Sequence, residues 1–124
     1  MRGSEMLDQL RALMAQHGDQ PVFDEEIEPI NSFRYVSAED ADGGESSVLL
    51  FRDESAPAPI TASALIAAYT QARDSSASNA DDPWDDLHIT NDDDMRVPEL
   101  IFTEAGRYVP EDPAGFAFDG NALG

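Results

Sequence analysis

The chain of 124 residues carries 26 acidic residues against seven basic ones, and its formal net charge at pH 7 is −19. All seven basic residues are arginines, and cysteine is absent, which excludes disulfides, thiolate chemistry and cysteine-based zinc sites. Like charges repel, so we expect neither direct nucleic-acid binding nor attraction to an anionic membrane. No apolar run approaches the roughly 20 residues of a membrane span, and no basic, apolar secretory leader opens the chain.

The first predicted element is a helix over residues 4–17. Apolar side chains recur there with the period of one helix face, at Met6, Leu7, Leu10, Leu13 and Met14. Ser4 is the expected N-terminal cap, and Gly18 is expected to end the helix.

Two strands are predicted next. Residues 33–37 and 47–52 are rich in aromatic and β-branched side chains, and residues 39–46 between them contain Gly43-Gly44. We expect the strands to form an antiparallel hairpin with a long acidic loop. The preceding stretch, residues 19–31, contains Pro21 and Pro29, so a long helix is not expected there.

The rest of the chain is predicted to hold one more helix and one more strand. Thr61 is the expected cap of a helix to about residue 73 that is apolar on most sides, which is typical of burial against a sheet. Residues 74–94 have the composition of a flexible acidic linker. Residues 97–103 predict a strand, with Pro98 indicating an edge position or a later start. Residues 104–124 are expected to be an irregular tail.

This element order predicts a small single α+β domain over residues 1–124. We expect a short, mostly antiparallel sheet with two helices and acidic loops, because helices after antiparallel strands pack on one side of a sheet.

The sequence contains no motif that indicates an enzyme, a metal site or a cofactor. It has neither a glycine-rich phosphate loop nor a nucleophile elbow. His17 lies in the apolar stripe of the first helix, where a packed structural role is expected, and His88 has no nucleophile at a recognisable spacing. Asp40 begins like a calcium loop, but the twelfth position is Phe51 instead of glutamate. We therefore predict no catalytic residues, no metal and no cofactor.

Local acidic clusters are the feature that points to a function. Seven of the 14 residues from 81 to 94 are aspartates, and Trp84, the sole tryptophan, lies among them. Trp84 is either a core residue reaching back from a loop or an aromatic anchor within an anionic rim, which is typical of binding hot spots. The predicted contact residues are this run and a second cluster in support: Asp81, Asp82, Trp84, Asp85, Asp86, Asp92, Asp93, Asp94, Asp24, Glu25, Glu26 and Glu28.

These clusters favour a non-catalytic inhibitor that mimics nucleic acid. Duplex DNA presents roughly one negative charge per 1.7 Å of axis, and carboxylates on one face can offer a similar field to a basic groove. In composition alone the chain is similar to phage-encoded proteins that block CRISPR effectors or restriction enzymes. The expected partner is a basic DNA- or RNA-binding protein in the host-cell cytoplasm, and a homodimer stays open.

Two alternatives remain from the sequence. The chain could be a phage virion or assembly component, in which Phe116 and Phe118 dock on a neighbouring subunit. It could instead be a halophilic domain whose carboxylates keep it hydrated, and such a domain should unfold below about 1 M salt. A small acidic secretion chaperone ranks lower, because residues 104–124 cannot supply the long terminal helix usual there.

Overall fold

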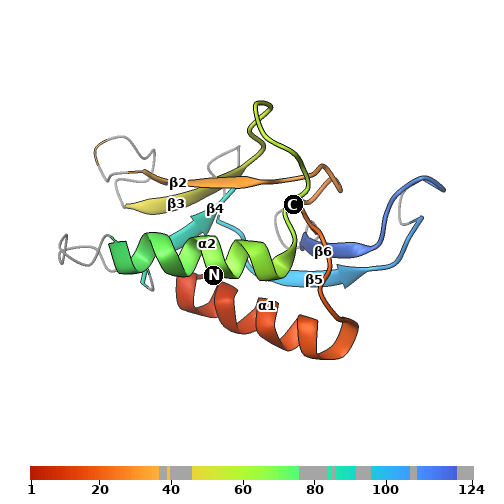
Figure 1. Ribbon diagram of the computed structural model, residues 1–124, viewed down its shortest axis with the longest axis horizontal. Helices are drawn as coiled ribbons and strands as arrows, with labels where there is room; N and C mark the ends of the chain where they lie inside the picture. Colours follow the sequence, from red (N-terminus) through yellow and green to blue (C-terminus); the bar gives the residue numbers. More distant parts are fainter. Residues whose placement is uncertain are drawn as a thin grey trace.

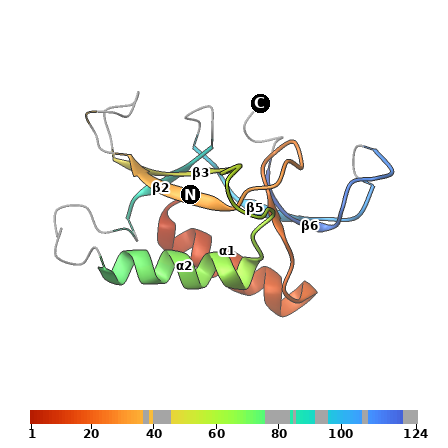
Figure 2. The ribbon, with the colours of Figure 1, turned by 45° about the horizontal axis from the view of Figure 1, so that its top comes forward.

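A computed structural model describes residues 1–36, 39, 46–75, 84, 86–91, 96–106 and 109–119. It confirms the predicted class, a small single α+β domain (Figure 1). The elements in chain order are α1 (Gly3–His17), β1 (Val22–Phe23), β2 (Ser32–Val36), β3 (Ser47–Phe51), α2 (Ala62–Ser75), β4 (His88–Thr90), β5 (Leu100–Thr103) and β6 (Gly115–Phe118). Both helices lie on one side of the sheets (Figure 2). Within the described residues, neither helix is long and apolar enough to cross a membrane.

The strands form two three-stranded sheets where we expected one. One sheet has the order β2-β3-β4 and the other the order β1-β6-β5. Each contains one antiparallel and one parallel pair, and the antiparallel ladder is the longer in both, with five paired positions for β2–β3 and four for β5–β6. The parallel pairs join segments far apart in sequence, which a local pattern of strand residues does not reveal.

Helix α1 matches the predicted range, but its cap differs. The helix starts at Gly3, and Arg2 is the N-cap residue, so the prediction that Ser4 caps it is wrong. The backbone N–H of Arg2 donates to Glu5 Oε1 at 3.1 Å, which closes the first turn. Gly18 ends the helix as predicted, at φ 78° and with its N–H bonded to the Met14 carbonyl.

The predicted hairpin is confirmed. Strands β2 and β3 are antiparallel, and Phe33 and Tyr35 lie opposite Leu50 and Val48. These four residues share the face that packs toward the helices, because successive side chains of a strand point to opposite faces. Arg34 lies on the other face, with its guanidinium carbon 5.8 Å from the centre of the Phe51 ring.

Helix α2 is capped by two residues from different parts of the chain. Thr61, the predicted cap, accepts a hydrogen bond from the Ala64 N–H at 3.3 Å. Asp19 adds a second acceptor, because its carboxylate takes the Ser63 N–H at 2.9 Å and the Ser63 hydroxyl. An acidic side chain at this end also suits the helix dipole.

Strand β5 begins at Leu100, so the predicted strand is present but starts after Pro98. Its first N–H donates to Gln9 Oε1 of α1 at 2.7 Å, which fixes helix and strand to one another. The strand lies at the edge of its sheet, as Pro98 indicated.

Two predicted irregular regions contain strands. The expected linker 74–94 includes the end of α2 and strand β4, although residues 76–83, 85 and 92–94 of it lie outside the described residues. The expected irregular tail contains β6, which is wholly buried and is the central strand of its sheet. A four-residue strand flanked by Pro113 and Asp119 has too few alternations to stand out from a loop.

The predicted docking role of Phe116 and Phe118 is therefore wrong. Both side chains are 0–1% exposed and belong to the main core of this chain. That core is continuous across both sheets and both helices, which is why the two sheets form one domain. Its buried members include Met6, Leu7, Leu10, Val48, Leu50, Leu65, Tyr69, Ile89, Val97, Leu100, Phe116 and Phe118.

The first three residues pack beside β4 as an additional edge segment. The N–H of Ile89 donates to the Met1 carbonyl at 2.9 Å, and the N–H of Gly3 donates to the Leu87 carbonyl at 2.9 Å. Gly3 is buried, and a Cβ there would overlap the Tyr69 hydroxyl and the Trp84 carbonyl oxygen. A glycine is thus required where α1 approaches α2 and the chain at Trp84.

Candidate acidic interface

The acidic cluster at residues 24–28 forms a tight loop organised by Asp24. Its Oδ1 accepts the N–H of Glu26 at 2.8 Å and the N–H of Glu28 at 2.9 Å. The loop closes through the Asp24 N–H, which donates to the Glu28 carbonyl at 2.9 Å. Ile27 is held at φ 61°, a left-handed conformation that β-branched residues rarely adopt, and its buried side chain packs with Phe23. The side chains of Glu26 and Glu28 point outward and are exposed.

The carboxyl group of Asp24 has a strongly altered affinity for protons. Partial burial raises its pKa to about 6 from 3.8, helped by the nearby charges of Glu25 and Glu26 and opposed by the two backbone hydrogen bonds. Desolvation favours the neutral acid, so the folded state binds a proton here more tightly than the unfolded chain does. The free energy of unfolding therefore falls as pH rises from about 4 to about 6, and the penalty is complete above that range.

Replacing Asp24 by asparagine is expected to stabilise the protein at pH 7.5. The amide keeps an oxygen that can accept both N–H groups but carries no charge to desolvate. Because the penalty disappears as Asp24 is protonated, the gain should shrink toward zero at pH 4. Urea denaturation of parent and variant at both pH values measures it.

Asp24→Ala is the matched control, because it removes the charge and the acceptor together. Leaving the Glu26 and Glu28 N–H groups unpaired should lower the free energy of unfolding by about 1–3 kcal/mol at either pH. An Asp24→Asn variant less stable than the parent at pH 7.5 would contradict the account of this loop.

The loop is tied to the end of β4, where a second acidic cluster begins. Asn91 is 2% exposed, and its Nδ2 donates to Glu25 Oε1 at 3.1 Å across 66 residues of sequence. Residues 92–94, the three aspartates that follow Asn91, lie outside the described residues. The hydrogen bond fixes the loop at 24–28 to the residue that directly follows β4.

Trp84 anchors the other end of this region to the core. Its carbonyl oxygen accepts the Tyr69 hydroxyl at 2.7 Å, and its ring meets Tyr69 edge to face at 5.4 Å and Phe33 at 6.0 Å between ring centres. The ring is partly buried against the main core. One side of the Trp84 ring thus packs against the core, which agrees with the interpretation of Trp84 as a core residue. The other side faces the Tyr35 ring in a stacked arrangement.

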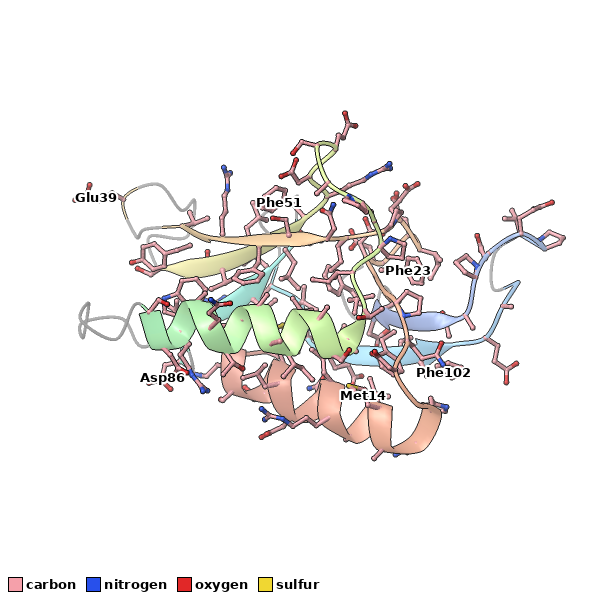
Figure 3. The ribbon with its side chains drawn as sticks, in the orientation of Figure 1. Met14, Phe23, Glu39, Phe51, Asp86 and Phe102 are labelled. Atoms are coloured by element: carbon pink, nitrogen blue, oxygen red, sulfur yellow. The ribbon has the colours of Figure 1, made fainter. Side chains whose placement is uncertain are left out.

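Tyr35 links this aromatic cluster to the residue that precedes β3. The Tyr35 ring contacts the Trp84 ring, and the Tyr35 hydroxyl donates to Ser46 Oγ at 3.1 Å. Tyr35 thereby holds Trp84 and Ser46 at the same end of strand β2. Glu39 and Asp86 lie at that same end of the molecule (Figure 3), and both are exposed.

The structure thus describes half of the predicted contact residues and groups them at two places. Asp24, Glu25, Glu26 and Glu28 form the loop beside Asn91, and Trp84 and Asp86 lie at the opposite end of β4. The remaining six lie outside the described residues: Asp81, Asp82, Asp85, Asp92, Asp93 and Asp94. Sequence reasoning missed Asn91, which donates to Glu25, and Tyr35, which contacts Trp84. An asparagine before an aspartate run carries no signal of burial, and Tyr35 reads as an ordinary strand residue.

Each of the two histidines packs against neighbouring parts of the fold. The His17 ring stacks on Phe102, with centres 3.9 Å apart and planes 12° apart, although the residue as a whole is exposed. His88 is partly buried in β4 opposite Ser47. Among the described residues, no three histidine, aspartate or glutamate side chains come together in a way that could hold a metal ion.

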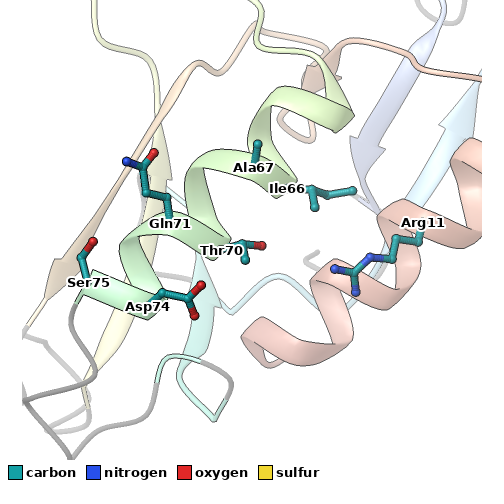
Figure 4. A pocket seen from close by; sticks show the side chains of 7 residues that line it. All are labelled: Arg11, Ile66, Ala67, Thr70, Gln71, Asp74 and Ser75. Atoms are coloured by element: carbon teal, nitrogen blue, oxygen red, sulfur yellow. The ribbon is translucent and has the colours of Figure 1, made fainter.

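A groove of about 680 Å³ lies between the two helices (Figure 4). Its lining residues are Arg11, Ile66, Ala67, Thr70, Gln71, Asp74 and Ser75. The described residues that line it supply two hydroxyl groups, one cation and one carboxylate.

No family model matches the chain, and no curated protein or solved structure is significantly similar to it.

Proposed function

We propose that this protein is a non-catalytic inhibitor that presents carboxylates to the nucleic-acid-binding groove of a basic protein. The observation that carries the proposal is the Asn91–Glu25 hydrogen bond, which holds the acidic loop at 24–28 beside the end of β4. In the sequence, three aspartates follow Asn91 directly. At the other end of β4, the ring of Trp84 contacts Tyr35, and exposed Asp86 follows Trp84 by two residues.

The number of carboxylates around β4 in the sequence suits this role. Duplex DNA presents roughly eight charges over about 13 Å of axis, the length that four steps of a strand cover. In the sequence, four aspartates precede β4 and three follow it, and the loop held to Asn91 adds four more carboxylates: Asp81, Asp82, Asp85 and Asp86, then Asp92, Asp93 and Asp94, with Asp24, Glu25, Glu26 and Glu28.

Seven arginines can neutralise only a minor part of 26 acidic residues. Two ion pairs between described residues, Arg11–Asp8 at 3.8 Å and Arg73–Asp74 at 3.4 Å, lie within their own helices and are at least partly exposed. Pairs of this kind contribute little to stability. The negative field therefore remains available to steer a basic partner at long range and to strengthen binding by counterion release.

Under this proposal the chain is a phage protein of the anti-CRISPR or anti-restriction type, and it acts in the host-cell cytoplasm. One alternative was a virion or assembly component that docks through Phe116 and Phe118. Both side chains are buried in the core of this chain, so neither is available for docking. The other alternative, a halophilic domain, predicts that the protein unfolds below about 1 M salt. A thermal melt in dilute buffer tests this prediction directly.

The test of the proposal is a charge-neutralised variant, Asp85→Asn, Asp86→Asn, Asp92→Asn and Asp93→Asn combined. Parent and variant are immobilised, exposed to a bacterial lysate, and the retained proteins are identified by mass spectrometry. The parent is expected to retain a nucleic-acid-binding protein that a salt gradient releases, and the variant is expected to lose it, because electrostatic contacts dominate such binding.

The matched control neutralises exposed glutamates away from both ends of β4. Glu104→Gln and Glu111→Gln combined should retain the same protein as the parent, since these residues lie between β5 and β6 in the chain. Equal retention by the parent and the Asp→Asn variant would exclude the assigned surface.

A further inference from the structure

The groove between α1 and α2 is lined by two side chains of opposite charge that face one another. Figure 4 shows the Arg11 side chain reaching from α1 toward α2, and the Asp74 carboxylate pointing back toward α1. Arg11 pairs with Asp8 of its own helix at 3.8 Å, and its side chain is 56% exposed. Asp74 is 70% exposed and pairs with its neighbour Arg73 at 3.4 Å. Exposed pairs of this kind are weak, so a ligand between the helices displaces them at little cost.

A hydroxyl group on the α2 side of the groove lacks a hydrogen-bond partner. Thr70 Oγ1 is buried, and among the described residues nothing donates to it or accepts from it. A threonine inside a helix commonly donates to the carbonyl four residues earlier, here that of Ile66, but Thr70 does not. Its hydroxyl points toward α1 instead (Figure 4). A buried polar group without a partner lowers stability, so this hydroxyl is a feature that folding alone does not explain.

A ligand in the groove can reach this hydroxyl. Arg11 and Asp74, which line the groove with Thr70, are exposed, and exposed side chains change rotamer within picoseconds to nanoseconds. A small movement of either side chain therefore uncovers the oxygen. The groove volume of about 680 Å³ lies within the range of small-molecule sites, about 300–1,000 Å³.

The charges on the two sides of the groove define the class of ligand. The Arg11 guanidinium offers parallel N–H donors to a carboxylate, and the Asp74 carboxylate accepts from an ammonium group. A simple anion is repelled by the excess of carboxylates on this chain, and a simple cation is attracted to every acidic cluster alike. A small zwitterion has no net charge, so it escapes the repulsion and matches both side chains. Ile66 and Ala67 add an apolar surface for the rest of the molecule.

We propose that the groove between α1 and α2 binds a free amino acid in its zwitterionic form. The ligand carboxylate lies on the Arg11 guanidinium and takes a further hydrogen bond from the Thr70 hydroxyl, and the ligand ammonium group lies on Asp74. This site uses other residues than the acidic interface and does not rest on the proposed function.

The first test identifies the ligand class by calorimetric titration of the parent with each of the common amino acids. The tightest binder is then compared with its N-acetyl derivative, which lacks the ammonium group, and with its carboxamide, which lacks the carboxylate. We expect each derivative to bind at least about tenfold more weakly, because each loses a charge-assisted hydrogen bond. Arg11→Gln and Asp74→Asn should each cause a loss of similar size. Arg52→Gln and Glu54→Gln, in the exposed loop after β3, are the matched controls and should leave the affinity unchanged.

The second test separates binding from stability at Thr70. Thr70→Val keeps the shape of the side chain and removes the unpaired hydroxyl, so the ligand-free variant should melt about 3–6 °C above the parent. The same variant should bind the amino acid more weakly than the parent does. Thr70→Ser keeps the hydroxyl and should keep the affinity. A purely structural role for Thr70 would change the melting temperature without changing the affinity.

Three results would overturn the proposal. The first is that none of the amino acids binds the parent. The second is that the N-acetyl and carboxamide derivatives bind as tightly as the amino acid itself. The third is that Arg11→Gln, Asp74→Asn and Thr70→Val all keep the affinity of the parent, which would place the ligand outside the groove. Retention of a nucleic-acid-binding protein from a lysate is measured separately, so none of these results bears on the proposed inhibitor function.

Discussion

Phe116→Ala is expected to lower the free energy of unfolding by about 3–5 kcal/mol. The side chain is fully buried in β6, between β1 and β5, and its ring meets Phe102 and His17 edge to face. Truncation removes its buried apolar surface and leaves a cavity that the sheet cannot close. Domains of this size are stable by only about 5–15 kcal/mol, so the loss is a large fraction of the total. Urea denaturation followed by circular dichroism measures it.

The control for this substitution is Val109→Ala, which lies in the turn between the same two strands. Val109 is 49% exposed, so its loss should change the free energy of unfolding by less than about 0.5 kcal/mol. An unchanged unfolding midpoint for Phe116→Ala would contradict the placement of β6 in the core and return Phe116 to the docking role expected from sequence.

Gly3→Ala is expected to lower the free energy of unfolding by about 2–3 kcal/mol, although alanine is the better helix former. The added methyl group would overlap the Tyr69 hydroxyl and the Trp84 carbonyl oxygen, so helix α1 or the chain at Trp84 must shift. Ser4→Ala is the neighbouring control, because Ser4 is not the helix cap, and it should be nearly neutral. Thermal melts of the two variants compare them.

A double-mutant cycle with Tyr69→Phe locates the origin of that loss. Tyr69→Phe alone removes the donor to the Trp84 carbonyl and should lower the free energy of unfolding by about 1–2 kcal/mol. The double variant should be less destabilised than the sum, because removing the hydroxyl removes one of the two overlaps. Strict additivity would contradict the packing of Gly3 against Tyr69.

Local patterns predicted the long elements well. The helix at Gly3–His17 follows from its apolar period, and the β2–β3 hairpin follows from two strand-like segments around a glycine-containing loop. What local patterns could not supply were the pairings across long separations. Strand β4 has three residues inside an aspartate-rich run, and β6 pairs in parallel with Val22–Phe23, 94 residues earlier in the chain.

The candidate site was predictable in composition and not in arrangement. The density of aspartate and glutamate marked the clusters, because charge is visible residue by residue. Their grouping depends on single contacts, Asn91 with Glu25 and Tyr35 with Trp84, that join segments 66 and 49 residues apart. A buried asparagine and an exposed tyrosine acquire these roles only once the sheet brings their strands together.

The most direct test of nucleic-acid mimicry is competition with duplex DNA. The protein that the immobilised chain retains from a bacterial lysate is challenged with increasing duplex DNA at constant salt, and the released fraction is measured. We expect duplex DNA to release the partner completely, because both ligands occupy the same basic groove. A partner that stays bound at saturating duplex DNA, or a lysate from which the chain retains no nucleic-acid-binding protein, would contradict it.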